Sequence, residues 1–229
     1  MLRPKKKISK REMKEDALVT SYVKVTGWYE ENKKFLNYGA LALVVIVIGA
    51  VIYFNNMSAS NEKAMTELGK VYTYYDNAQY ILAIDGVPER NIAGLKSIVE
   101  NYGGSDAGDL ARFYLGNCYY QLRRFDEALE QYDDFSPPGQ LLTVSRLAGI
   151  AACREAKGEY AEAASSFEKA AVTYSNDVGA AENLGNAARN FVQAGNKERA
   201  LELYKKIKKE FPKSPLARDV DRYIAQLSI

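Results

Sequence analysis

Apolar residues recur along much of this chain with the three-to-four-residue spacing of an α-helix. The clearest stretch is residues 115–132, where Leu115, Tyr119 and Leu122 mark one face and Ala128 and Tyr132 mark a second. Side chains with this spacing share one side of a helix and can be buried together. The two apolar runs are separated by only a few polar residues. The pattern therefore predicts two short helices folded back on each other.

The same hairpin pattern returns at regular intervals. Small residues that suit close helix contacts stand at Ala128, Ala163 and Ala200, spaced by 35 and then 37 residues. The pattern resembles the tetratricopeptide repeat (TPR), a helix–turn–helix unit of about 34 residues. One such hairpin cannot bury its apolar face alone, so neighbouring units are expected to stack. The sequence predicts an all-α, TPR-type solenoid of about three to four repeats.

We predict seven segments from these patterns. They are a basic cytoplasmic tail (1–34), a transmembrane signal anchor (35–55), a degenerate first TPR unit (62–108), three TPR units (109–140, 141–178 and 179–213) and a capping helix (214–229). Within the first unit, we expect one helix over 62–84, a break at 85–88 and a second helix over 91–102. Residues 86–90, which overlap this break, align with residues 195–199 in the last unit. The clearest repeat should have its helices over 109–122 and 126–135.

The membrane segment is the 19-residue stretch Leu36–Phe54, which carries no charge. At about 1.5 Å per residue, a helix of this length nearly crosses a hydrocarbon core of about 30 Å. Tyr38 and Tyr53 lie near its two ends, where interfacial aromatics are common. A cleaved signal peptide and a buried helix are the alternatives. A long polar lead and a poor cleavage site after Tyr53 favour an uncleaved anchor.

The charges around this segment predict its orientation. Residues 1–34 hold ten Lys or Arg against five Asp or Glu, whereas residues 55–61 hold no basic residue. The positive-inside rule therefore places the N-terminus in the cytoplasm and residues 55–229 across the inner membrane, in the periplasm. Leu18, Tyr22, Val25 and Tyr29 line one face of the tail. They fit a membrane-surface helix or a solvated tail that only sets topology, and the sequence favours the tail.

Composition argues against several classes of function. From Asn55 onward, 21 basic residues face 24 acidic ones, which does not suit nucleic-acid binding. The chain has no histidine, so the commonest general base and most zinc sites are missing. Cys118 and Cys153 occupy equivalent repeat positions and fit packing better than redox chemistry. We predict no catalytic residue, cofactor or metal and no small-molecule substrate, and therefore not an enzyme.

A groove lined by the first helix of each repeat is the candidate binding site. The positions that match TPR groove residues are Leu110, Phe113, Asn117, Tyr120, Gln121, Glu155, Arg189, Val192 and Gln193. Exposed apolar and aromatic side chains in such a groove would bind an extended peptide or a helix of another protein. The alternative is a groove that is merely solvated.

The whole layout resembles the YfgM-like ancillary subunits of the SecYEG translocon, membrane-anchored TPR proteins, in their Bacteroidetes-type versions. The resemblance is strongest over 101–227 and includes the segments LARFYLGNCY (110–119) and YKKIKKEFPKS (204–214). It implies a non-enzymatic adaptor whose partners are Sec translocon subunits, periplasmic chaperones or translocated clients. A structural subunit of an envelope-assembly or secretion complex, with one fixed partner in the groove, is the alternative.

Overall fold

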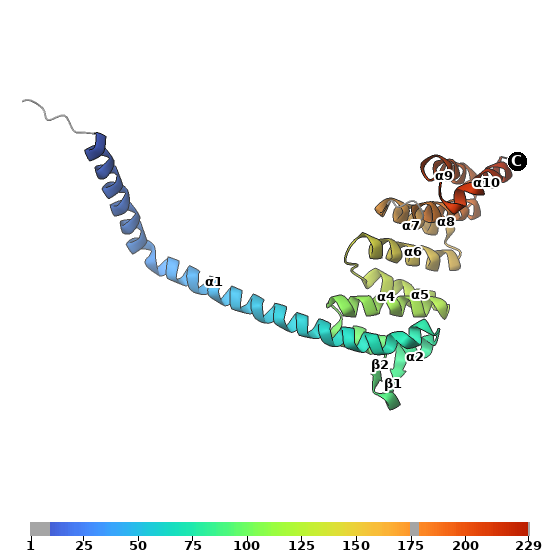
Figure 1. Ribbon diagram of the computed structural model, residues 1–229, viewed down its shortest axis with the longest axis horizontal. Helices are drawn as coiled ribbons and strands as arrows, with labels where there is room; N and C mark the ends of the chain where they lie inside the picture. Colours follow the sequence, from blue (N-terminus) through green and yellow to red (C-terminus); the bar gives the residue numbers. More distant parts are fainter. Residues whose placement is uncertain (1–9, 175–178, 229) are drawn as a thin grey trace, which may run out of the picture. The chain divides into compact units, whose positions relative to one another are not determined.

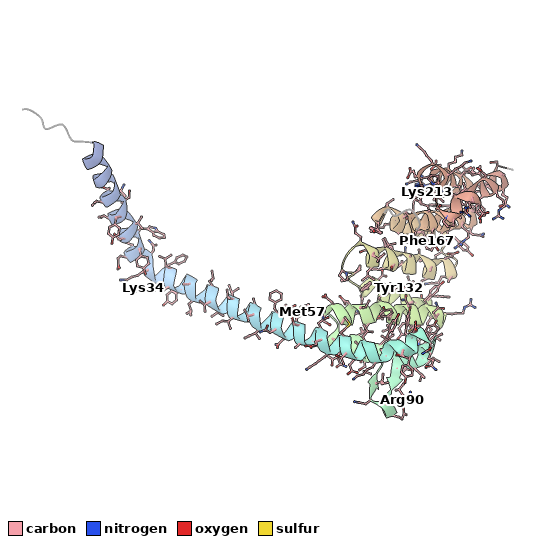
Figure 2. The ribbon with its side chains drawn as sticks, viewed as in Figure 1. Lys34, Met57, Arg90, Tyr132, Phe167 and Lys213 are labelled. Atoms are coloured by element: carbon pink, nitrogen blue, oxygen red, sulfur yellow. The ribbon has the colours of Figure 1, made fainter. Side chains whose placement is uncertain are left out.

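The computed structural model describes residues 10–174 and 179–228 (Figure 1). Side chains are described from Val19 onward (Figure 2). The start of the predicted tail (1–9) and residues 175–178 of the repeat predicted at 141–178 lie outside this description. The described chain is all-α apart from one small β-hairpin. It divides into two compact units, Met1–Asn56 and Met57–Ile229.

Helix α1, Lys10–Asp76, begins in the first unit and ends in the second. Its apolar part reaches a mean hydropathy of 2.5 over an 18-residue window, none of which is buried inside the protein. By length and composition this helix can span a membrane. The helix expected from residue 62 is thus continuous with the predicted span.

The predicted helix over residues 62–84 is wrong in one respect, because it is interrupted. Helix α1 ends at Asp76, and the separate helix α2, Tyr80–Asp85, follows. Between them Ala78 adopts a left-handed conformation with φ 57°. The amide of Gln79 donates to the carbonyl of Tyr74 at 2.9 Å, which closes the end of α1.

Residues 86–94 also differ from the prediction. They form strands β1, Gly86–Val87, and β2, Ile92–Ala93, joined by the short 3-10 helix η1, Pro88–Arg90. The strands pair antiparallel. Helix α3, Leu95–Tyr102, therefore begins four residues later than expected. Gly86 and its aligned counterpart Gly195 both follow a helix with positive φ, 84° and 81°, but Gly86 leads into a strand, whereas Gly195 leads into the next helix.

Three stacked hairpins follow, and Figure 1 shows them one after another in chain order. They are α4 (Asp106–Gln121) with α5 (Phe125–Asp134), α6 (Gln140–Ala156) with α7 (Tyr160–Thr173), and α8 (Gly179–Gln193) with α9 (Lys197–Glu210). The turns inside the hairpins share one geometry, because Arg123, Gly158 and Gly195 all have positive φ at the equivalent position. The repeating sequence pattern therefore corresponds to a repeating structure.

The small residues of the repeat pack where the pattern predicts. Ala128, Ala163 and Ala200 are completely buried. Cys118 and Cys153 are also completely buried and are free thiols. Burial raises the pKa of each thiol to about 12, so both are neutral at physiological pH. These observations support the packing role predicted for the two cysteines.

Tyr132 on α5 connects two neighbouring hairpins (Figure 2). A Cβ added at Gly116 on α4 would lie 2.9 Å from its ring, and one added at Gly149 on α6 would lie 2.7 Å away. Only glycine allows both helices to come this close. The ring is almost fully buried between them and joins the α4–α5 hairpin to the α6–α7 hairpin.

The chain ends with the 3-10 helix η2, Pro215–Arg218, and helix α10, Val220–Leu227. The hydroxyl of Ser214 accepts a hydrogen bond from the amide of Ala217 and so caps η2. Val220 is fully buried, and Tyr223 stacks on Tyr204 of α9 with the ring centroids 5.0 Å apart. Helix α10 covers the end of the last hairpin, as expected for a cap.

Candidate peptide-binding groove

The nine predicted groove residues lie on three helices, α4, α6 and α8, each the first helix of its hairpin. On α4, the side chains of Leu110, Phe113 and Tyr120 are half-buried and pack against the core, while Gln121 is exposed. Burial raises the pKa of Tyr120, which therefore stays protonated at physiological pH. The α4 positions thus combine partial burial with a remaining accessible surface.

Asn117 is held in place from both sides. Its side-chain amide donates to the hydroxyl of Tyr75 at 3.2 Å, and its carbonyl oxygen accepts from the hydroxyl of Tyr132 at 2.6 Å. These bonds tie α4 to α1 and to α5. Asn117 therefore fixes the neighbouring aromatic rings, a role that its position alone did not predict.

Aromatic rings surround Asn117. Phe113 lies 5.4 Å from Phe135 between ring centroids, and Tyr75 lies 4.8 Å from Tyr114. Tilted and edge contacts at these distances stabilise aromatic pairs beyond their buried area. The α4–α5 hairpin and the end of α1 therefore form a packed aromatic cluster beside Asn117.

Glu155 and Arg189 are partners of each other. One guanidinium nitrogen of Arg189 on α8 donates to both carboxylate oxygens of Glu155 on α6, at 2.8 and 3.0 Å. The Arg189 and Glu155 side chains are 54% and 29% exposed, so the pair sits at the surface. The sequence predicted both residues for the groove but not their pairing. The pair connects the α6–α7 hairpin with the α8–α9 hairpin.

The structure contains a recess beside Arg189, which we call the C-terminal cleft. It consists of two adjoining cavities of ≈ 270 and ≈ 170 Å³ that share Arg189, Tyr204 and Tyr223 in their walls. Val192 and Gln193 line the smaller cavity. Three of the nine predicted residues therefore line the cleft.

The remaining walls of the cleft come from residues outside the predicted groove positions. Leu216 of η2 lines the larger cavity and Leu227 of α10 the smaller one, and both belong to the segment predicted only as a capping helix, 214–229. Tyr204 lies on α9, inside the repeat predicted at 179–213, and lines both cavities. Burial raises the pKa of Tyr204. No single sequence position signals this cleft, because it forms only where η2 and α10 fold back on α8 and α9.

The cleft offers binding groups rather than a recognisable catalytic set. Its walls combine leucine, proline, alanine and tyrosine side chains with Glu182, Asn186, Arg189 and Ser214. Among the residues that the structure describes, no group of three or more His, Cys, Asp or Glu side chains could hold a metal ion. Burial raises the pKa of the Asp109 carboxyl, which lies on α4 away from the cleft lining. The arrangement suits an apolar side chain flanked by hydrogen-bonding groups.

Comparison with known proteins supports the repeat assignment. A family model described as a tetratricopeptide repeat matches residues 98–139 and 153–215. No curated protein matches the chain. The matched segments include the hairpins α4–α5 and α8–α9, the whole of α7 and the end of α6. TPR modules typically bind other proteins and are not themselves enzymes. The matching segments and the stacked hairpins α4–α9 together show a helix–turn–helix solenoid with tetratricopeptide repeats within residues 98–215.

Proposed function

We propose that this protein is a non-enzymatic adaptor that is anchored in the inner membrane and binds segments of other proteins in its TPR groove. Residues 36–54 form the anchor, the N-terminus is cytoplasmic and the solenoid is periplasmic. The apolar length of α1 and the charge bias of residues 1–34 support this arrangement.

The C-terminal cleft is the observation that carries the proposal. It adjoins the groove positions of α8 and has apolar walls, with one guanidinium and several amide and hydroxyl groups at its edges. A hydrophobic side chain from a bound segment can fill it while the segment's backbone bonds to the polar groups. Peptide recognition commonly combines an apolar anchor with backbone hydrogen bonds in this way.

We further propose that the partners are proteins at the Sec translocon: translocon subunits, periplasmic chaperones or translocated clients. The resemblance to YfgM-like subunits supports this choice. An anchor confines the solenoid to the membrane plane and so raises its effective concentration near the translocon. Weak contacts in the groove then suffice for function.

Site-specific photo-crosslinking tests the binding site. A photoreactive residue replaces Gln193, an exposed residue that lines the cleft, and in a matched variant it replaces Lys169, an exposed residue on α7 outside the cleft lining. We expect protein crosslinks from position 193 and few from position 169. Many different nascent clients would indicate a chaperone role, whereas one stoichiometric partner would indicate a structural subunit. Equal crosslinking from both positions would contradict the groove proposal.

Protease protection tests the topology separately. Protease added outside spheroplasts should digest residues 55–229 and leave the N-terminal tail protected. If residues 55–229 stay intact while a known periplasmic protein in the same spheroplasts is digested, the periplasmic location is contradicted.

A further inference from the structure

The segment of α1 before the predicted span is covered with exposed apolar side chains. Between residues 19 and 35, seven large hydrophobic or aromatic side chains are each at least 50% exposed: Val19, Tyr22, Val23, Val25, Trp28, Tyr29 and Phe35. Among the described residues, no side chain of the core clusters comes from this segment. Such a density of exposed apolar surface indicates a contact that the chain itself does not provide.

The segment is also a poor helix by itself. It contains the β-branched residues Val19, Thr20, Val23, Val25 and Thr26, followed by Gly27, all of which have low helix propensity. In water, helical stability comes mostly from the packing of an apolar face. A helix over residues 19–35 therefore needs an environment that covers this face.

Two polar side chains of the segment bond back to the helix. The hydroxyl of Thr26 donates to the carbonyl of Tyr22 at 2.8 Å, and the side-chain amide of Asn32 donates to the carbonyl of Trp28 at 2.8 Å. Intrahelical bonds of this kind lower the cost of moving a hydroxyl or an amide out of water. They suit an environment less polar than water.

Helical geometry separates two faces. At about 100° per residue, Tyr22, Val25 and Tyr29 share one side, with Trp28 at its edge, whereas Lys24, Glu31 and Lys34 lie on the other. Lys33 follows Tyr29 on the first side, at the end of the segment, where its long side chain can reach the headgroups. Tryptophan and tyrosine favour the boundary between lipid headgroups and acyl chains. Residues 1–34 carry ten basic and five acidic side chains, which favours contact with an anionic lipid surface.

We propose that residues 19–35 lie along the cytoplasmic surface of an anionic lipid bilayer, with the face of Tyr22, Val25 and Tyr29 toward the acyl chains. This inference rests on the proposed membrane anchor. Because α1 is continuous from Lys10 to Asp76 in the structure, a surface position requires the helix to bend near Phe35, where the span begins, when it meets the bilayer. The exposed face, the interfacial aromatic residues and the adjacent apolar span favour a lipid surface over the solvated tail that the sequence alone favoured.

Trp28 provides a direct test because it is the only tryptophan in the chain. The full-length protein is reconstituted into phosphatidylcholine vesicles with and without phosphatidylglycerol. Flotation of the vesicles reports anchoring, and Trp28 emission reports the position of the segment. We expect a shift of the emission to shorter wavelength and quenching by brominated lipid, both stronger with phosphatidylglycerol. Flotation with water-exposed Trp28 would overturn the surface proposal alone, whereas failure to float would overturn the anchor.

A matched pair of variants tests the orientation of the face. Val25 and Val23 are 64% and 60% exposed, but they point to opposite sides of the helix. Val25→Asp should move Trp28 into water and abolish lipid quenching, whereas Val23→Asp should preserve both signals. Equal effects of the two variants would overturn the proposed face. A blue-shifted emission that is lost when the protein is diluted in excess lipid would show pairing of two copies, which would also overturn it.

Discussion

Replacing Gly149 by alanine tests how closely the α4–α5 and α6–α7 hairpins must pack. The added methyl group would lie 2.7 Å from Cζ, 2.9 Å from Cε2 and 3.0 Å from Cε1 of the Tyr132 ring. The ring cannot simply move away, because Gly116 holds α4 against its other side. Its hydroxyl is also fixed by the hydrogen bond to Asn117 at 2.6 Å. The methyl group must therefore push α6 away from α5.

Two opposing effects decide the magnitude. Extra methyl groups in a well-packed core cost about 1–3 kcal/mol, whereas replacing glycine by alanine inside a helix contributes about 1 kcal/mol of stability. The rigid ring, pinned on two sides, places the cost at the upper end of its range. We expect Gly149→Ala to lower the free energy of unfolding by about 1–2 kcal/mol. For a domain of this size, each kcal/mol lowers Tm by about 2–4 °C.

Urea and thermal unfolding of the second unit, residues 57–229, measure the effect. Gly69→Ala is the matched control, because Gly69 lies in α1 and a methyl group added there would meet no atom within 4 Å beyond its own stretch of helix. This control should stabilise the unit by about 1 kcal/mol. Combining Gly149→Ala with Tyr132→Leu removes the ring, and the alanine should then no longer destabilise. If Gly149→Ala alone stabilises the unit as much as Gly69→Ala does, the close packing described here is wrong.

Two further predictions concern pH and one turn. The pKa of the Cys118 and Cys153 thiols rises from 9.0 to about 12 on folding, so their contribution to stability is complete below pH 9 and is lost as pH rises toward 12. The urea midpoint of unfolding should therefore be lower above pH 9 than below it, and this difference should be smaller in the variant with both cysteines replaced by alanine. Arg123 adopts φ 61° where Gly158 and Gly195 stand in the next two turns, so Arg123→Gly should raise the free energy of unfolding by about 0.5–1 kcal/mol, and an unchanged or lower value would contradict a strained turn.

The repeating hairpins could be predicted from the sequence because small residues mark each close helix contact. Ala128, Ala163 and Ala200 recur at nearly constant spacing, and all three are completely buried. Such positions tolerate little besides a small side chain, so packing leaves a local trace in the sequence. Helices α4 and α5 accordingly begin and end within three residues of their predicted bounds.

The segment predicted as the first TPR unit, residues 62–108, could not be predicted as well, because no glycine or proline marks the point where α1 ends and α2 begins. Ala78 takes the left-handed conformation that glycine usually supplies at the end of a helix. Tertiary context overrides such local preferences, and it is not visible in a local sequence pattern. The hairpin at 86–93 was missed because its glycine and proline were also consistent with the turn between two repeat helices.

The groove shows the same division between local and tertiary information. Repeat positions predicted which residues lie on the first helices, but not how those residues interact. Asn117 bonds to Tyr75, a residue 42 positions earlier, and Glu155 bonds to Arg189, 34 positions later. These pairings follow from the stacking of the repeats. A residue that matches a groove position can therefore serve the scaffold instead of a ligand.

The second helix of a hairpin carries a tyrosine, Tyr132 in α5 and Tyr204 in α9, and the position of the cleft follows from what packs on each ring. At the first junction, Gly116 and Gly149 let two helices close around Tyr132 and leave no room beside its ring. At the last junction η2 and α10 replace a further repeat, and Tyr204 stacks on Tyr223 instead. The space left around these two rings is the C-terminal cleft. Crosslinking from Gln193 should therefore exceed crosslinking from Gln121, although both are exposed groove positions. Equal yields would mean that the first repeat also binds.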